Sequence, residues 1–79
     1  MELCASVSEL AKTTMQGRQG GAPMNKLMET AKGNKLIEEL IILAYDSPRY
    51  GTESMRAKSI ENFRDKAYLE CIKEFRKNK

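Results

Sequence analysis

The sequence predicts an all-α fold, a compact four-helix domain with a long C-terminal helix, in which residues 1–79 form a single domain. Three observations lead to this prediction. Apolar residues recur at helical spacing along most of the chain, and no alternating strand pattern of useful length occurs. Glycine and proline residues divide the chain into four such segments. The length of 79 residues, with 41% apolar and 32% charged residues, is typical of one small globular domain.

The first helix carries one apolar stripe, and Cys4 lies within it. The other members of this stripe are Leu3, Val7, Leu10, Ala11, Thr14 and Met15. We expect the helix to end at Gly17 or soon after, because the pair Gly20-Gly21 breaks it.

The second helix is short. Pro23 suits its first turn, where the missing N–H costs nothing, and Gly33 suits a left-handed terminator. Between these two residues the apolar positions keep helical spacing, at Met24, Leu27, Met28 and Ala31.

The third helix has Asn34 as its expected N-cap. It ends before Pro48, because a residue that precedes proline, here Ser47, is pushed out of helical dihedral angles. Apolar residues cover more than half of its circumference, namely Leu36, Ile37, Leu40, Ile41, Leu43 and Ala44. We therefore expect this helix to be the central and most buried element.

The last helix begins after Thr52, its expected N-cap, and Glu53 is favourable in its first turn. Nothing breaks the pattern from there to about Lys77, which gives about 25 residues and a length of roughly 37 Å. Its apolar stripe comprises Ile60, Phe63, Ala67, Tyr68, Cys71, Ile72 and Phe75.

The two cysteines, Cys4 and Cys71, lie in the apolar stripes of the first and last helices. A disulfide between them would close most of the chain into a loop, stabilise the fold by about 4 kcal/mol and imply an oxidising compartment. Alternatively, both are reduced thiols that fill the core. A third interpretation is a reactive thiol, activated by a lysine or a helix terminus because the chain has no histidine. We predict the disulfide, and the two alternatives stay open at this stage.

The absence of histidine excludes a serine–histidine or cysteine–histidine pair and an imidazole metal ligand. Two cysteines so far apart in sequence do not form a zinc site. Carboxylates do pair at helical spacing, Glu61 with Asp65 and Glu70 with Glu74, but basic residues surround them, which is typical of a solvated charged face. We therefore expect no enzyme activity, no metal and no cofactor.

The net charge of +3 is uneven, because residues 48–79 hold nine basic and five acidic groups. Acidic residues interleave with the basic ones along the last helix, so we do not expect it to bind nucleic acid. No run of about 18 apolar residues is present, so we expect no membrane insertion.

Two connectors, residues 18–21 and 46–53, hold side chains that neither the core nor solvation explains. Arginine and tyrosine on rigid turns are typical anchors of protein interfaces. We predict a protein-binding patch formed by Arg18, Gln19, Arg49 and Tyr50. The alternative is that Tyr50 packs under its loop while Arg18 or Arg49 ties down the helix ends.

Motifs in both halves of the chain are similar to those of one group of proteins. The first half contains Cys4, Leu10-Ala11, Met15-x-x-Arg18-Gln19-x-Gly21 and Met24-x-x-Leu27-Met28. The second half contains Ala44-Tyr45-x-x-Pro48-Arg49-Tyr50-x-Thr52-Glu53 and Ile60-x-x-Phe63-x-x-Lys66-x-Tyr68-x-x-Cys71. Over nearly its whole length the chain thus resembles small uncharacterised two-cysteine helical proteins encoded by phages and prophages. Those proteins are commonly exported behind a leader peptide, so the resemblance implies a periplasmic location, adds support for the disulfide and suggests a host-directed accessory role.

Together these inferences predict a non-catalytic phage accessory protein, periplasmic or secreted, that binds a host or phage envelope protein. Superinfection exclusion, lysis modulation and inhibition are roles of this type. Residues 1–20 lack the basic start and apolar block of a signal peptide, so a cytoplasmic location is the alternative. There the chain would be a regulator that binds nucleic acid or a host transcription component. A homo-oligomeric structural unit is the third hypothesis.

Overall fold

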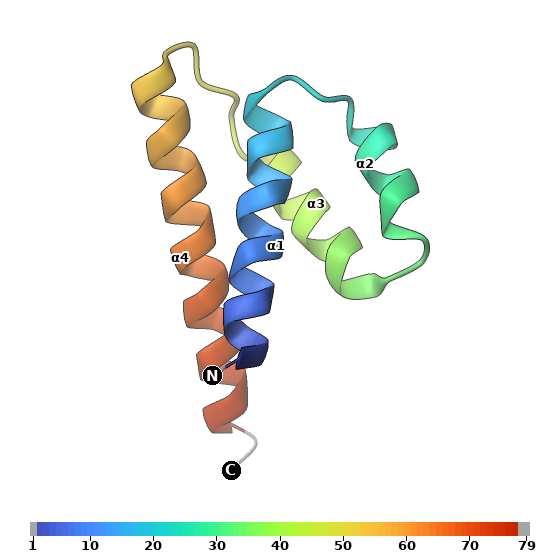
Figure 1. The fold of residues 1–79 in the computed structure, drawn as a ribbon, viewed down its shortest axis with the longest axis vertical. Coiled ribbons are helices and arrows are strands. Elements are labelled where there is room, and N and C mark those ends of the chain that lie inside the picture. Colours follow the sequence, from blue (N-terminus) through green and yellow to red (C-terminus); the bar gives the residue numbers. More distant parts are fainter. Residues whose placement is uncertain (1, 78–79) are drawn as a thin grey trace.

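A computed structural model describes residues 2–77 and confirms the predicted all-α fold (Figure 1). The four helices, in chain order, are α1 (Glu2–Gln19), α2 (Met24–Ala31), α3 (Lys35–Asp46) and α4 (Glu53–Lys77). No strand occurs within residues 2–77.

Two predicted N-caps are confirmed by their hydrogen bonds. The Asn34 side-chain oxygen accepts from the backbone N–H groups of Leu36, at 3.0 Å, and Ile37, at 3.2 Å. The Thr52 hydroxyl accepts from the backbone N–H of Met55 at 3.2 Å. Each cap satisfies donors that the first turn of a helix leaves without an intrahelical partner. Helices α3 and α4 therefore begin where the sequence predicts.

Helix α1 ends at Gln19, soon after Gly17 as predicted, whereas the boundaries of α2 differ in detail from the prediction. Pro23 is the N-cap residue of α2, with extended dihedral angles (φ −66°, ψ 140°), and does not lie inside the first turn. At the other end Lys32 and Gly33 are both left-handed, so α2 ends one residue earlier than a terminator at Gly33 alone would place it. Helix α1 continues through Gly17, against which Leu27 of α2 packs.

The central helix is α1, and the prediction that the third helix is central is wrong. Helix α1 lies between α4 on one side and α3 and α2 on the other (Figure 1). It also holds most of the buried residues, namely Cys4, Val7, Ser8, Ala11, Thr14, Met15 and Gln19. Helix α3 buries only Leu40, Ile41 and Ala44.

The physical reason is that α3 has more apolar residues than its neighbours can cover. Because α3 packs against α1 and α2, Leu36, Ile42 and Leu43 each stay between 44% and 48% exposed. Helix α1 instead has small side chains such as Cys4 and Ala11, both 0% exposed, which let neighbouring helices approach closely. Position in the fold, and not apolarity alone, decides which helix is buried.

The predicted disulfide is present between Cys4 and Cys71, which join the first turns of α1 to the last third of α4. The two Cα atoms are 5.5 Å apart, the usual separation for a disulfide. The bond fixes α1 against α4 at the end of the molecule opposite to the α1–α2 connector (Figure 1).

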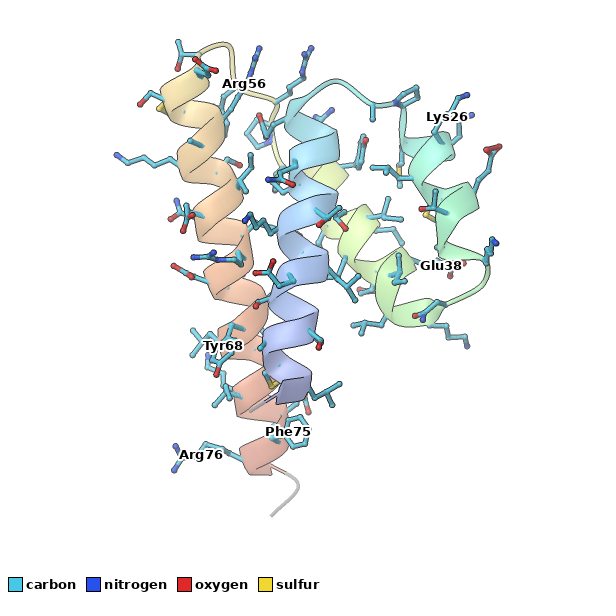
Figure 2. All side chains as sticks on the ribbon, in the orientation of Figure 1. Lys26, Glu38, Arg56, Tyr68, Phe75 and Arg76 are labelled. Atoms are coloured by element: carbon cyan, nitrogen blue, oxygen red, sulfur yellow. A yellow bond between two sulfur atoms is a disulfide. The ribbon has the colours of Figure 1, made fainter. Side chains whose placement is uncertain are left out.

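Helices α3 and α4 both pack mainly against α1 and have little contact with each other. As a result, no residue of the 25-residue helix α4 is fully buried. Figure 2 shows Phe75 and Arg76 leaving opposite sides of α4. The side that carries Phe75 faces an open space between the two helices, which forms part of the candidate site.

Candidate functional site

Gln19, the last residue of α1, is the buried centre of a network that joins the two connectors. Its side chain is 2% exposed. The amide Nε2 donates to the Pro48 carbonyl at 2.9 Å, and Oε1 accepts from the Tyr50 backbone N–H at 2.9 Å. A further contact of 3.4 Å joins Nε2 to the hydroxyl of Ser59 in α4. The amide therefore fixes the backbone on both sides of Arg49.

Arg18 and Arg49 complete this network from opposite directions. Nε and Nη2 of Arg18 both donate to the Ser47 carbonyl, at 3.1 and 3.0 Å. The same guanidinium lies over the ring of Tyr45, 5.1 Å from its centroid, in a cation–π contact. In return, Nε of Arg49 donates to the Gln19 carbonyl at 3.1 Å.

Gly21 makes room for the Arg49 guanidinium. Its φ of +90° lies in the left-handed region, and a Cβ atom there would be only 3.0 Å from Arg49 Nη2. Both the backbone conformation and the close approach therefore require glycine.

Two further bonds hold the connectors in place. Nε of Arg56 donates to the Tyr50 carbonyl at 2.7 Å, and the Tyr45 hydroxyl donates to the Ala22 carbonyl. We call the set Arg18, Gln19, Arg49 and Tyr50 the clasp, because its bonds hold the second connector (residues 46–53, between α3 and α4) against the end of α1.

The four residues predicted as a protein-binding patch thus lie together, but their polar groups are largely used inside the protein. Gln19 has almost no surface to offer a partner. Arg18 and Arg49 tie down the end of α1 and the second connector, which is the alternative role predicted for these arginines. A contact between a partner and Arg18, Arg49 or Tyr50 stays a prediction.

Between α3 and α4 the structure has a second feature, an apolar groove of about 700 Å³. Its floor is formed by Val7 and Met15 of α1. Its two walls, together with the end that the α3–α4 connector closes, present the apolar side chains of Leu36, Leu40, Leu43, Pro48, Tyr50, Phe63, Ala67 and Phe75. Cys71, the α4 partner of the disulfide, also lines it. The groove exists because α3 and α4 pack on α1 and leave the space between them open.

The rim of the groove is acidic although the chain as a whole is basic. Glu39 and Asp46 lie on the α3 wall, and Glu70 and Glu74 lie on the α4 wall. Lys66 is the one basic side chain among the lining residues of the described chain. All five are exposed, so the net charge of −3 at the rim faces solvent next to an apolar surface.

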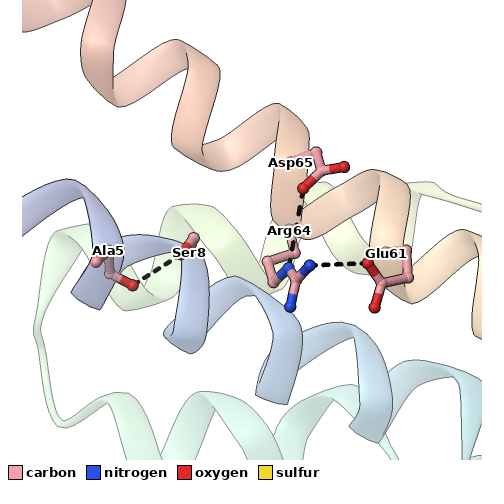
Figure 3. A network of polar contacts seen from close by, with 5 residues as sticks. All are labelled: Ala5, Ser8, Glu61, Arg64 and Asp65. Carbon is pink, nitrogen blue, oxygen red and sulfur yellow. Dashed lines mark hydrogen bonds and ion pairs between the residues drawn. The ribbon is translucent and has the colours of Figure 1, made fainter.

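The two carboxylate pairs of α4 have different surroundings. Glu70 and Glu74 lie on the rim of the groove, whereas Glu61 and Asp65 lie on either side of an arginine. Arg64 lies between Glu61 and Asp65, with Nη2 2.8 Å from Glu61 Oε2 and Nε 3.9 Å from Asp65 Oδ1 (Figure 3). Figure 3 also shows the bond by which the buried Ser8 hydroxyl of α1 donates to the Ala5 carbonyl. Within residues 2–77 no group of three or more metal-ligating side chains comes together.

The groove itself was not predicted from the sequence. The feature of the sequence that could have indicated a groove is the surplus of apolar residues on the third helix, which cover more than half of its circumference. One packed face cannot bury so wide a stripe, so part of it had to line an open surface. Which other helix would form the opposite wall depends on the packing of α1, which periodicity does not reveal.

Comparison of the chain with models of known protein families, with curated proteins and with solved structures finds no match. In the part of the chain that the structure describes, no helix combines the length and the apolarity needed to cross a membrane.

Proposed function

We propose that this chain is a non-catalytic protein-binding domain whose groove between α3 and α4 receives a segment of a partner protein. One observation carries the proposal: the groove is apolar, has a volume of about 700 Å³, and stays uncovered by the chain's own described residues. A contiguous apolar surface with a polar rim is typical of an interaction site, because leaving it in water is unfavourable.

The clasp supports this function by giving the groove a rigid end. Tyr50 and Pro48 line the groove, and Gln19 holds the backbone of both. Of the four residues predicted to bind a partner, we therefore assign direct contact to Tyr50. Arg18 and Arg49 would act by holding the connector that presents it.

The proposed setting is that of a phage accessory protein outside the reducing cytoplasm, with a host or phage envelope protein as partner. The resemblance to exported phage and prophage proteins supports the phage origin. The Cys4–Cys71 disulfide is consistent with an oxidising compartment.

Photo-crosslinking in bacterial host cells tests the groove. A photoreactive amino acid replaces either Leu43, which lines the groove and is 48% exposed, or Leu69, which lies outside it on α4 and is 51% exposed. We expect a protein adduct of defined mass from position 43 and none from position 69. Equal adducts from both positions, or none from position 43, would contradict the proposal.

Free-thiol titration of the natively produced protein tests the compartment separately. We expect no titratable thiol, because both cysteines are joined. Two reactive thiols would exclude the periplasmic setting and leave the groove proposal standing.

A further inference from the structure

We propose that the groove binds an α-helical segment of another protein, with an apolar stripe flanked by lysine or arginine residues. This inference rests on the proposed function and specifies the partner of that site. It follows from the shape of the groove, from the hydrogen bonds that the backbone groups of its walls already make, and from the charge of its rim.

The shape of the groove fits an elongated partner. The α4 residues that line it extend from Ser59 to Phe75, a length of about 24 Å at 1.5 Å per residue. Opposite them, Leu36 and Leu43 present exposed side chains seven positions apart on α3, two helical turns. A helix that places apolar residues at i, i+3, i+4 and i+7 would lay a matching stripe between these walls.

The backbone of the walls favours a helix over an extended strand. Both walls are α-helices, in which the interior N–H and C=O groups already bond to each other. A strand laid in the groove would find few free backbone partners and would lose those that water supplies. A helical segment satisfies its own backbone groups and needs only side-chain contacts from the groove.

The charge of the rim favours a partner helix with basic residues on both sides of its apolar stripe. Carboxylates lie on both walls, Glu39 and Asp46 on α3 and Glu70 and Glu74 on α4. Two of these charges are offset on α4, because Lys66 lines the groove and Nζ of Lys73 lies 3.9 Å from Oε1 of Glu70, so Glu39, Asp46 and one α4 carboxylate keep the rim acidic on both walls. Basic residues on both sides of an apolar stripe would meet opposite charge along both edges, which speeds association and sets orientation. A nucleic-acid backbone would be repelled by the same carboxylates.

A second copy of the chain fits this rim poorly. A symmetric dimer through the groove would use the same surface on both copies. The two acidic rims would then meet, and like charges across an interface are unfavourable.

Three synthetic helical peptides with one shared leucine stripe test the proposal. Their flanking positions are all lysine, all glutamine or all glutamate, and binding to the intact chain is measured by fluorescence anisotropy. We expect the lysine peptide to bind roughly 10-fold more tightly than the glutamine peptide at low ionic strength, and the glutamate peptide to bind least. The ratio should fall as salt is added, because the rim charges are exposed.

Two pairs of variants assign the site. The double variant Glu39→Gln/Glu74→Gln should weaken binding of the lysine peptide roughly 3- to 10-fold at low salt. Its control, Glu9→Gln/Glu29→Gln, removes the same charge from exposed positions outside the groove and should have little effect.

The second pair of variants tests the apolar surface: Leu43→Gln should weaken the binding of all three peptides, whereas Leu69→Gln should not. Both leucines are about half exposed, so the fold should survive, which circular dichroism checks.

The outcomes separate this inference from the proposed function. Groove binding that depends on Leu43 but is equal for the three peptides, or strongest with glutamate, would overturn the basic partner and leave the protein-binding groove intact. A dimer in solution that Leu43→Gln dissolves would show that a second copy is the occupant, which also overturns the inference. Failure of every peptide to bind, together with no adduct at position 43, would overturn both.

Discussion

At the scale of single residues, Gln19 is important because its one buried amide joins two connectors. Its Nε2 and Oε1 atoms bond to the Pro48 carbonyl and the Tyr50 N–H, which have no helical partner in this connector. A buried polar group that loses its partner costs about 1–3 kcal/mol, since water cannot replace the lost bond.

We therefore predict that Gln19→Leu, which keeps a side chain of similar volume but removes the amide, lowers the free energy of unfolding by about 1–3 kcal/mol. Gln16→Leu is the matched control, because Gln16 lies on the same helix and is exposed. Its effect should stay within about 0.5 kcal/mol. Urea denaturation followed by circular dichroism gives both values, and equal stabilities would contradict the assigned role of Gln19.

Gly21→Ala should also destabilise the protein, by about 1–2 kcal/mol from the left-handed backbone alone. The added Cβ would also displace the Arg49 guanidinium, from which it would lie 3.0 Å away. Gly51→Ala is the control, because Gly51 lacks a positive φ and has no atom within 4 Å of the added Cβ. Thermal unfolding should separate the two variants, and a Gly21 variant as stable as the Gly51 variant would contradict this account.

At this scale the sequence already indicates which residues matter but not how they act. Arg18, Gln19, Arg49 and Tyr50 are identifiable as connector residues with no role in a core stripe. Their mutual bonds depend on where the second connector passes the end of α1. That position is set by the packing of α3 on α1, which acts over long sequence separation.

Among the elements, helix ends are the best predicted feature, because they depend on short-range chemistry. Asn34 and Thr52 cap the helices that follow them through bonds to residues two or three positions away. The central position of α1 could not be predicted in the same way. It depends on which faces of three helices meet, and the more apolar α3 was the misleading candidate.

We predict that Asn34→Ala removes the cap of α3 and lowers the free energy of unfolding by about 1 kcal/mol. The loss leaves the N–H groups of Leu36 and Ile37 without their acceptor. Asn25→Ala, inside α2 and exposed, should have little effect or slightly stabilise, because alanine has the higher helix propensity. Chemical denaturation of the two variants checks this, and a smaller effect at position 34 than at position 25 would count against the cap.

For the whole molecule, the decisive feature is that α1 is fixed at both ends. The disulfide holds its beginning against α4, and the clasp holds its end against the second connector. Helices α3 and α4, which form the walls of the groove, both pack against α1. The disulfide and the clasp therefore both influence the width of the groove.

Removing the disulfide should therefore have the largest effect on stability. We predict that Cys4→Ala/Cys71→Ala lowers the free energy of unfolding by about 4 kcal/mol, because the bond closes a long loop with a sequence separation of 67. Reduction of the unaltered protein should cause a similar loss, which urea titrations with and without reductant measure. A double variant as stable as the oxidised protein would show that the bond contributes nothing to the fold.

The disulfide also decides how the molecule would respond to mechanical tension. Because Cys4 and Cys71 lie close to the two ends of the described chain, a pull applied at those ends passes directly through the sulfur–sulfur bond. The covalent link then carries the load, and α2, α3 and most of α1 and α4 are shielded from it. A domain stretched between two anchoring points would keep the groove residues from Val7 to Cys71 in place until that bond is broken, whereas Glu74 and Phe75 lie beyond Cys71 and would carry the load.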